Sequence, residues 1–489
     1  MCVSASMIKV NTYMFRRPFI AKHRPPSSLS TVRPAHTQPF PPHLSLLADK
    51  CTSMRQLQQI HAQMLVSATI HDNFAASRLL SFSALSINGD LIYASKLLNS
   101  VQQPNMFMWN TLIRGLAISP KPHEAVLLYT KMRRIGVTPG KHTFPFLLKA
   151  CSSLQSVKSC KQVHSQVVKV GLDLDFHVVN NLIRGYSVSS GLMHARQLFD
   201  EMPDRNVNIW TTMVCGYAQS DRAQEALALF NEMVAKGFEP NGPSLSSVLS
   251  ACAQSGCLDM GEKIHSYIME KGFETEVILG TALVNMYAKN GALLMARSCF
   301  VNMPRKNIIT WNVMISGLAV HGHAKEALEL FQELEKHDVG PNDSTFVGVL
   351  SACCHAGMLD FGRKVFNSMR NVYGIEPKIQ HYGCMVDLLG RSGMVLEAEE
   401  LINRMPWKAD LKILGALLSA CGSHGNIEVA ERVVKKMLLL ENDNHGVYVV
   451  LSNMYADAGR WDDVSRLREI MKDGSLKKTP GWSLVGDED

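Results

Sequence analysis

Residues 308–342 read IITWNVMISGLAVHGHAKEALELFQELEKHDVGPN, a stretch that predicts a single hairpin of two helices. Apolar residues recur at intervals of three and four in both halves, which is the spacing of one buried helix face. They are Trp311, Met314, Ile315 and Leu318 before Gly322, and Ala327, Leu328, Phe331 and Leu334 after it. We expect the second helix to stop before Gly340-Pro341, since glycine can take the left-handed cap and proline cannot continue the helix.

This hairpin recurs along the chain with a period of 101 residues. The period is marked by four sets of identical residues: Trp109, Trp210 and Trp311; Glu124, Glu225 and Glu326; Pro139, Pro240 and Pro341; Cys151, Cys252 and Cys353. Recurring helix sequences divide each period into units of 35, 35 and 31 residues, of which the first three are 106–140, 141–175 and 176–206. Self-similarity at a fixed period indicates a solenoid.

Stacking of these units is obligatory. Ordering a 35-residue unit costs roughly 35 to 70 kcal/mol of backbone entropy, which two helices alone cannot recover. We therefore predict an all-α superhelix of stacked helix-turn-helix units, in place of the three domains that 489 residues would otherwise suggest.

Composition argues against a membrane span or a metal site. The chain is 46% hydrophobic and 19% charged, with no run of 18 apolar residues, so we expect a soluble protein without a membrane partner. Its 12 cysteines include no C-x-x-C pair. Because Cys151, Cys252, Cys353 and Cys421 occupy the same place in similar helices, we interpret them as small core residues. The nearest metal-like groupings, around His355 and His424, also lie in repeat helices, so we predict no metal and no cofactor.

The N-terminal segment 1–43 differs from the rest of the chain. It carries six Lys or Arg residues, and no acidic residue occurs before Asp49. This composition predicts a transit peptide for an organelle, with the mitochondrion favoured over the chloroplast; the alternative is a basic arm that stays attached. Without those six charges the formal net charge of +7 falls to near +1, so bulk charge gives no argument for nucleic-acid binding.

Polar residues recur at two places in each unit. One set precedes the apolar run of the first helix: Asn110, Asn180, Thr211, Thr281 and Asn312. The other set ends the unit: Asn206, Asn241, Asn307 and Asn342, with Gly140 as the exception. Two interpretations stay open from the residues alone. Such pairs can read one base per repeat on a single strand of RNA, or they can be helix caps and turn residues.

The alternating units of 35, 35 and 31 residues resemble the P, L and S motifs of plant pentatricopeptide repeat proteins of the PLS class. Residues 44–410 resemble the repeat array, 411–483 resemble the E-type extension of the E subgroup, beginning LKILGALLSACGSHGNIEVAE, and 484–489 form a short tail. The resemblance implies a right-handed superhelical solenoid.

In this family the fifth and last residues of P and S motifs together read one base. Carried onto this chain, the pairs are Asn110 with Gly140, Asn180 with Asn206, Thr211 with Asn241, Thr281 with Asn307, and Asn312 with Asn342. The resemblance implies adenine for Thr with Asn and a pyrimidine for Asn with Asn. The implied target is pyrimidine, any, pyrimidine, adenine, any, adenine, pyrimidine. Asn110 with Gly140 and Gly383 with Asp410 depart from the usual pairs, and L motifs have no defined code.

The function implied by an E-type extension is site recognition for C-to-U editing of organellar RNA. A zinc deaminase needs H-x-E and P-C-x-x-C, and neither occurs in the sequence. No deaminase domain follows the extension before Asp489. We therefore expect a non-catalytic guide that recruits a DYW-type cytidine deaminase in trans, with accessory editing factors on the L motifs 141–175 and 242–276. The alternatives are an RNA-binding factor for splicing, stability or translation, and a protein-binding scaffold.

Overall fold

The computed structural model describes residues 43–273, 277–337, 339–441 and 446–473, which form 26 α-helices and one short 3-10 helix, η1 (Thr69–His71), without a strand. The odd-numbered helices are α1 (His43–Ala48), α3 (Asn73–Leu85), α5 (Met106–Ala117), α7 (Thr143–Ser153), α9 (Phe176–Val188), α11 (Val207–Gln219), α13 (Gly242–Ser255), α15 (Val277–Lys289), α17 (Ile308–Val320), α19 (Asp343–Ala356), α21 (Ile379–Arg391), α23 (Leu411–His424) and α25 (Gly446–Asp457). The even-numbered helices are α2 (Met54–Val66), α4 (Leu91–Ser100), α6 (His123–Arg134), α8 (Val157–Val170), α10 (Leu192–Glu201), α12 (Ala223–Ala235), α14 (Leu258–Lys271), α16 (Leu293–Asn302), α18 (Ala324–Leu334), α20 (Leu359–Asn371), α22 (Val395–Arg404), α24 (Ile427–Leu440) and α26 (Trp461–Asp473). The proposed transit peptide, apart from its last residue, and the 484–489 tail lie outside the described residues.

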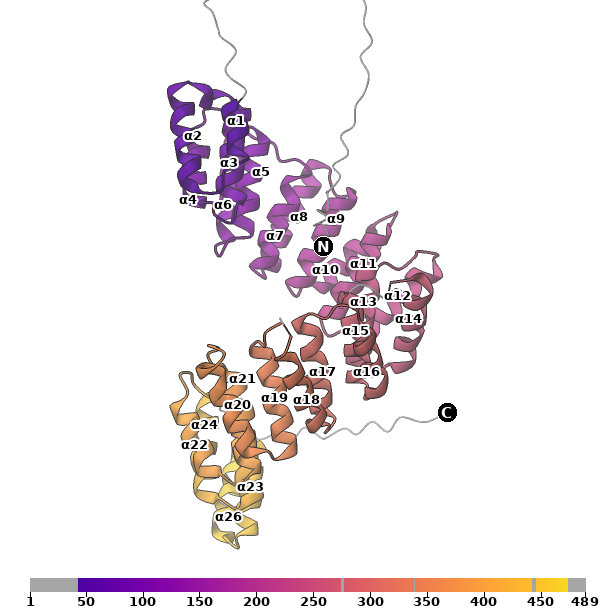
Figure 1. Ribbon diagram of the computed structural model, residues 1–489, viewed down its shortest axis with the longest axis vertical. Coiled ribbons are helices and arrows are strands. Elements are labelled where there is room, and N and C mark those ends of the chain that lie inside the picture. The colour runs from indigo at the N-terminus through magenta and orange to yellow at the C-terminus, as the bar shows by residue number, and fades with distance from the viewer. Residues whose placement is uncertain (1–42, 274–276, 338, 442–445, 474–489) are drawn as a thin grey trace, which may run out of the picture.

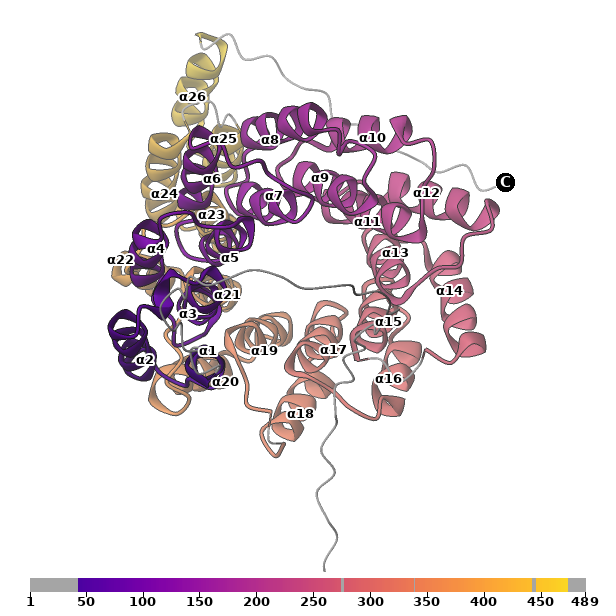
Figure 2. The same cartoon turned by 90° about the horizontal axis from the view of Figure 1, so that it is seen from above.

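The helices form two concentric layers. From α1 to α25 each odd-numbered helix contacts the next odd-numbered helix, so these helices make a continuous inner layer. The even-numbered helices cover that layer from outside, and among the described residues only α22 and α24 bring their backbones close together within the outer layer, while other outer neighbours such as α16 and α18 meet through side chains. Figure 2 shows the inner helices around a central opening and the outer helices at the periphery.

The layers wind into a right-handed superhelix. Seen from the N-terminal end in Figure 2, the chain runs clockwise from α3 through α9, α13 and α17. Figure 1 shows that it recedes along the long axis from α1 towards α26. The all-α solenoid predicted from the sequence is therefore confirmed. In the described residues no helix is long and apolar enough to cross a bilayer.

The repeated apolar residues build the core between the layers. Trp109, Trp210 and Trp311 are at most 3% exposed, and the repeated cysteines Cys151, Cys252, Cys353 and Cys421 are 0% exposed. Trp210 meets Phe199 edge to face with ring centroids 4.9 Å apart, and Trp311 meets Phe300 in the same way at 5.0 Å. The prediction that these cysteines are core residues is confirmed.

The second helix of 308–342 stops before Gly340-Pro341 as predicted, but the predicted left-handed cap at Gly340 was wrong. Helix α18 ends at Leu334, which is its last buried residue, and Gly340 does not have left-handed backbone. Beyond Leu334 a further turn would bury nothing, so the chain leaves the helix earlier than Gly340-Pro341 requires. In the two upstream copies the left-handed turn falls on Gly136 (φ 84°) and Gly237 (φ 81°), two residues before the position that corresponds to Gly340.

The inner helices approach closely where the tenth residue of a 35-residue unit is glycine. At Gly115, Gly216 and Gly317 an added Cβ would collide with the preceding inner helix, and at Gly317 it would lie 2.6 Å from the Cβ of Ala288. Stacking at this distance requires a residue without a side chain.

We expect Gly317→Ala to lower the thermal unfolding midpoint. Alanine at position 288 has no side-chain torsion that could relieve the contact, so α15 and α17 must separate. Overpacking of this kind costs about 1 to 3 kcal/mol. The matched control is Gly422→Ala in α23, whose Cβ meets no atom within 4 Å. That change should stabilise the helix by about 0.5 to 1 kcal/mol. Circular dichroism during heating separates the two variants, and equal midpoints would contradict the close-packing explanation.

Candidate nucleic-acid interface

The asparagines that end the units are helix N-caps. The Oδ1 atoms of Asn206, Asn241, Asn307 and Asn342 accept the backbone N–H groups of Ile209, Ser244, Thr310 and Thr345, at 3.0, 3.0, 3.0 and 3.1 Å. The capping interpretation is thus confirmed for these four residues. Capping also fixes each side chain beside the first turn of the next inner helix. The cap uses the side-chain oxygen and leaves the amide N–H groups available for other hydrogen bonds.

The polar residues within the first helices are not caps, because each lies one turn inside its helix. In two units the structure joins the predicted pair directly. Thr211 Oγ1 donates to Asn241 Oδ1 at 3.2 Å, and Asn312 Nδ2 donates to Asn342 Oδ1 at 3.0 Å. All four side chains except the buried Thr211 are partly exposed.

Two further pairs are joined less directly. Thr281 and Thr310 share a hydrogen bond between hydroxyls at 2.7 Å, and Thr310 Oγ1 donates to Asn307 Oδ1 at 3.0 Å, so Thr310 bridges that pair. Asn180 Oδ1 instead accepts from Thr212 Oγ1 at 2.6 Å and has no bond to Asn206.

Thr310 and Thr345 were missed by the sequence reasoning. Thr345 Oγ1 donates to Asn312 Oδ1 at 2.6 Å, so it holds the amide of the fifth residue in place. A signal was present, because Asn followed three residues later by Ser or Thr is the pattern of a capping box, and both Asn241 and Asn342 form one.

The pair Asn110 with Gly140 differs from the others. Asn110 is 8% exposed and its Oδ1 has no hydrogen-bond partner. Gly140 supplies no side chain, and a Cβ there would lie 3.0 Å from the Sδ atom of Met106. Its backbone N–H donates to Thr143 Oγ1 at 3.1 Å, which is the half of the capping box that also occurs at Asn241 and Asn342.

One of the pairs, Asn312 with Asn342, lines a groove between α15 and α17 on the inner layer. This groove has a volume of about 350 Å³, and its lining includes Asn312 and Asn342 together with Ile309, Asn285 and Ser316. Asn285 and Ser316 are ninth residues of their units, so the ninth position faces the same side as the fifth.

The ninth position carries a gradient of charge that bulk composition concealed. It is basic and exposed in three successive inner helices, at Arg114, Lys149 and Arg184, and none of the three makes an ion pair with a described residue. It is then neutral at Cys215, Ser250, Asn285, Ser316 and Ser351, and acidic at Asp387 in α21. The N-terminal part of the inner face therefore attracts phosphate most strongly.

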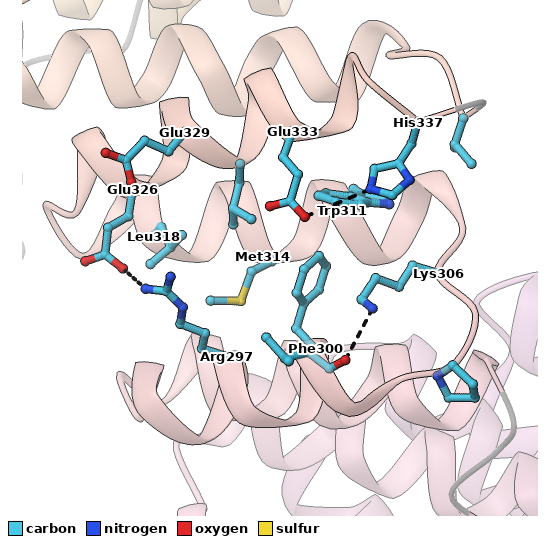
Figure 3. Close-up of a pocket in the computed structure, with 14 residues that line it drawn as sticks. Arg297, Phe300, Lys306, Trp311, Met314, Leu318, Glu326, Glu329, Glu333 and His337 are labelled. Carbon is cyan, nitrogen blue, oxygen red and sulfur yellow. Dashed lines mark hydrogen bonds and ion pairs between the residues drawn. The ribbon is translucent and has the colours of Figure 1, made fainter.

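A second groove lies in the outer layer between α16 and α18, with a volume of about 510 Å³ (Figure 3). Trp311 lies at its floor, and Glu326, Glu329 and Glu333 line one wall. Arg297 on the opposite side is already bound to Glu326 at 2.6 Å. The three carboxylates outnumber the two basic side chains that line the groove, Arg297 and Lys306, and Arg297 is already paired, so this groove is a poor site for a nucleic-acid backbone.

The cysteine and histidine groupings near positions 353 and 421 form no metal site among the described residues, where no cluster of three potential ligands occurs. Burial raises the pKa of Cys353 to about 11 and that of Cys421 to about 11, so both are thiols at neutral pH. The thiol of Cys354 donates to Asp387 Oδ2 at 2.9 Å.

Comparison with known families and proteins agrees with this geometry. The family model for the PPR repeat family matches residues 104–153, 205–254 and 306–355, and that for the PPR repeat matches 177–207, 244–273, 281–308, 344–372 and 381–408. The model for the E motif matches residues 424–486.

Relatives from Arabidopsis thaliana span most of the chain. One pentatricopeptide repeat-containing protein is 38% identical over 469 residues, covering 88% of each chain. Another, named as chloroplastic/mitochondrial, is 38% identical over 95% of this chain and 75% of its own length. A third, named as mitochondrial, is 33% identical over 91% of this chain and 85% of its own length.

Among solved structures, the maize pentatricopeptide repeat protein PPR10 in complex with an 18-nt psaJ RNA element has the same fold. It superposes with a TM-score of 0.65 at 17% identity, over 86% of this chain and 65% of its own chain. With relatives of this identity and coverage, and with repeat matches along the superhelix, the chain belongs to the pentatricopeptide repeat family and carries an E motif.

Proposed function

We propose that this protein binds single-stranded RNA along the inner face of its superhelix and serves as a site-recognition factor for C-to-U editing in a plant organelle. The observation that carries the proposal is the row of paired polar side chains on the inner layer, above all Thr211 with Asn241 and Asn312 with Asn342. The complex of PPR10 with RNA supports the RNA-binding part, and the E motif supports the editing part.

Base reading in this proposal depends on preorganisation. Asn241 and Asn342 are held by backbone N–H groups before any RNA arrives, so little side-chain freedom is lost on binding. Their amide N–H groups and the fifth residues then offer donors and acceptors to one base edge per repeat. We assign adenine to the pairs of Thr211 and Thr281, and a pyrimidine to the pairs of Asn180 and Asn312. Each correct base contributes about 1 to 3 kcal/mol of discrimination.

The protein itself is proposed to be non-catalytic, with a cytidine deaminase of the DYW type acting in trans, because the sequence lacks the H-x-E and C-x-x-C ligands of a zinc deaminase. We place the repeat array at 44–410 and the E-type extension at 411–483, and we propose that accessory factors contact the L motifs. Relatives named as chloroplastic or mitochondrial support an organelle, and we favour the mitochondrion on the basic composition of 1–43.

The basic ninth residues should govern the salt dependence of RNA binding. We expect Arg114→Ala, Lys149→Ala and Arg184→Ala together to reduce the slope of log affinity against log salt by about 2, since each phosphate contact on a single strand contributes about 0.7. Fluorescence anisotropy with a mixed-sequence single-stranded RNA measures the slope. The control replaces Lys158, Lys161 and Lys169 by alanine, which removes equal charge from the outer helix α8. An equal change in both variants would refute an inner-face binding site.

Base preference should follow the fifth residue. Thr211→Asn converts its pair to the asparagine pair already present at Asn312 and Asn342, so the preferred base should change from adenine to pyrimidine. We expect the affinity ratio between RNAs carrying A or C at that position to change by about 1 to 3 kcal/mol, or about 5- to 150-fold. Thr130→Asn on the outer helix α6 is the matched control and should leave the ratio unchanged. An unchanged ratio for Thr211→Asn, with RNA binding intact, argues against the assigned code.

Editing itself is tested in plants that lack this protein. Organellar cDNA should lose C-to-U conversion at one or a few cytidines that follow the implied base string, and the wild-type chain should restore it. A chain carrying Trp461→Ala changes a tryptophan that is 64% exposed on α26 within the E motif. Because exposed aromatic side chains are typical of protein contacts, this variant should bind RNA normally and restore editing poorly. Unchanged editing in the knockout, with unspliced introns or altered transcript ends, would favour the alternative role in RNA processing.

A further inference from the structure

Two buried cysteines of one hairpin lie against each other. Cys151 in α7 and Cys160 in α8 are both 0% exposed. Their thiols are close enough to shift one another's pKa by hydrogen bonding. The sulfur of Cys160 also lies 3.7 Å from Ser189 Oγ and 3.5 Å from the point that a Cβ on Gly185 would occupy.

The repeat makes Cys160 an exception. Cys151 recurs in the next two periods as Cys252 and Cys353, but the counterparts of Cys160 are glycines, Gly261 and Gly362. The residue of the next inner helix that faces this position changes from small to large. Gly185 is replaced by Met286 and Leu388, whose side chains would collide with a Cβ on Gly261 and Gly362. Of these three copies, only the hairpin of α7 and α8 therefore has both the second sulfur and the space for it.

A later copy of this hairpin has the backbone spacing that a disulfide requires. In the copy at Gly362, an ideal Cβ would lie 3.5 Å from the Cβ of Cys353, the counterpart of Cys151. Disulfides need Cβ atoms about 3.5 to 4.5 Å apart. Cys151 and Cys160 stand at the same two positions of their own L motif, so we expect a similar separation between them.

We propose that Cys151 and Cys160 are a redox-active dithiol, which a peroxide converts into a disulfide that joins α7 to α8. The Cys160 sulfur attacks one peroxide oxygen, so an S–O bond forms, the O–O bond breaks and one water leaves. The Cys151 sulfur then attacks the sulfenic sulfur of Cys160, so the S–S bond forms and a second water leaves. The two thiols lose two electrons and two protons, and the peroxide receives them.

The environments of the two sulfurs suit these roles. Hydrogen bonding with Cys151, opposed by burial and aided by Ser189, lowers the pKa of Cys160. The pKa of Cys151 is raised, first by its hydrogen bond with Cys160 and then by burial. Cys160 also has the Ser189 hydroxyl 3.7 Å from its sulfur, so we assign it as the sulfur that reacts first and Cys151 as the thiol that resolves it.

The test uses the full chain, reduced, freed of reductant and treated with hydrogen peroxide. Free thiols are then alkylated under denaturing conditions, and the digest is analysed by mass spectrometry. We expect a cross-linked species joining Cys151 to Cys160, lighter by two hydrogens, about 2 Da, and reversed by dithiothreitol. Cys421 is the internal control, since it is equally buried at the same helix position and has Ala430 where Cys160 would stand. It should be recovered as a free thiol.

Variants separate this pair from adventitious oxidation. With Cys151→Ser, Cys160 lacks its resolving partner and should proceed to the sulfinic acid without any cross-link. The proposal is overturned if Cys151 and Cys160 in the wild-type chain are alkylated as fully as Cys421, or if Cys160 links to a cysteine outside this hairpin. The measurement involves no RNA, so its outcome is independent of the proposed role in editing.

Discussion

The rest of the structure depends on the close contact between successive inner helices. A two-helix unit cannot recover its own ordering entropy, so its inner helix must pack on the next one. Gly115, Gly216 and Gly317 set how near those helices come. That spacing aligns the fifth, ninth and last positions of every unit into rows along one face, and a row of equivalent positions is what a repeated ligand such as a nucleic-acid strand requires.

The two interpretations that the sequence left open for the terminal asparagines are compatible. Asn241 and Asn342 cap helices through Oδ1, and the same oxygen also accepts from Thr211 or Asn312. A cap is therefore a means of holding the amide rigid beside the fifth residue. This explains why asparagine suits the position better than serine or aspartate, which would cap as well but would offer no amide N–H groups.

The sequence predicted most of what is periodic, although it missed the capping residue Thr345, and it missed what is not periodic. The hairpins, the buried tryptophans and the rows of polar residues all follow from the 101-residue period. The cap at Gly340 failed because the helix ends where burial ends, a tertiary effect. The basic row at Arg114, Lys149 and Arg184 was missed because bulk charge averages the inner face with acidic residues of the outer helices, such as Glu326. Cys160 was missed because it breaks the period, and its meaning depends on the space left by Gly185.

The charge at the ninth position changes along the inner face, so different repeats would contribute differently to the proposed binding of RNA. Arg114, Lys149 and Arg184 favour any phosphate backbone, so the N-terminal units supply affinity that is independent of sequence. The middle units are neutral at the ninth position and carry the paired side chains at Thr211 and Asn312, so in the proposed function selectivity would depend on base edges there. Asp387 lies beyond them, on the side of the E motif, and is paired with Arg391, so the ninth position offers phosphate no free positive charge there. If the RNA binds as proposed, the nucleotides nearest the E motif are the easiest to release to a deaminase, which must take its cytidine out of the stack.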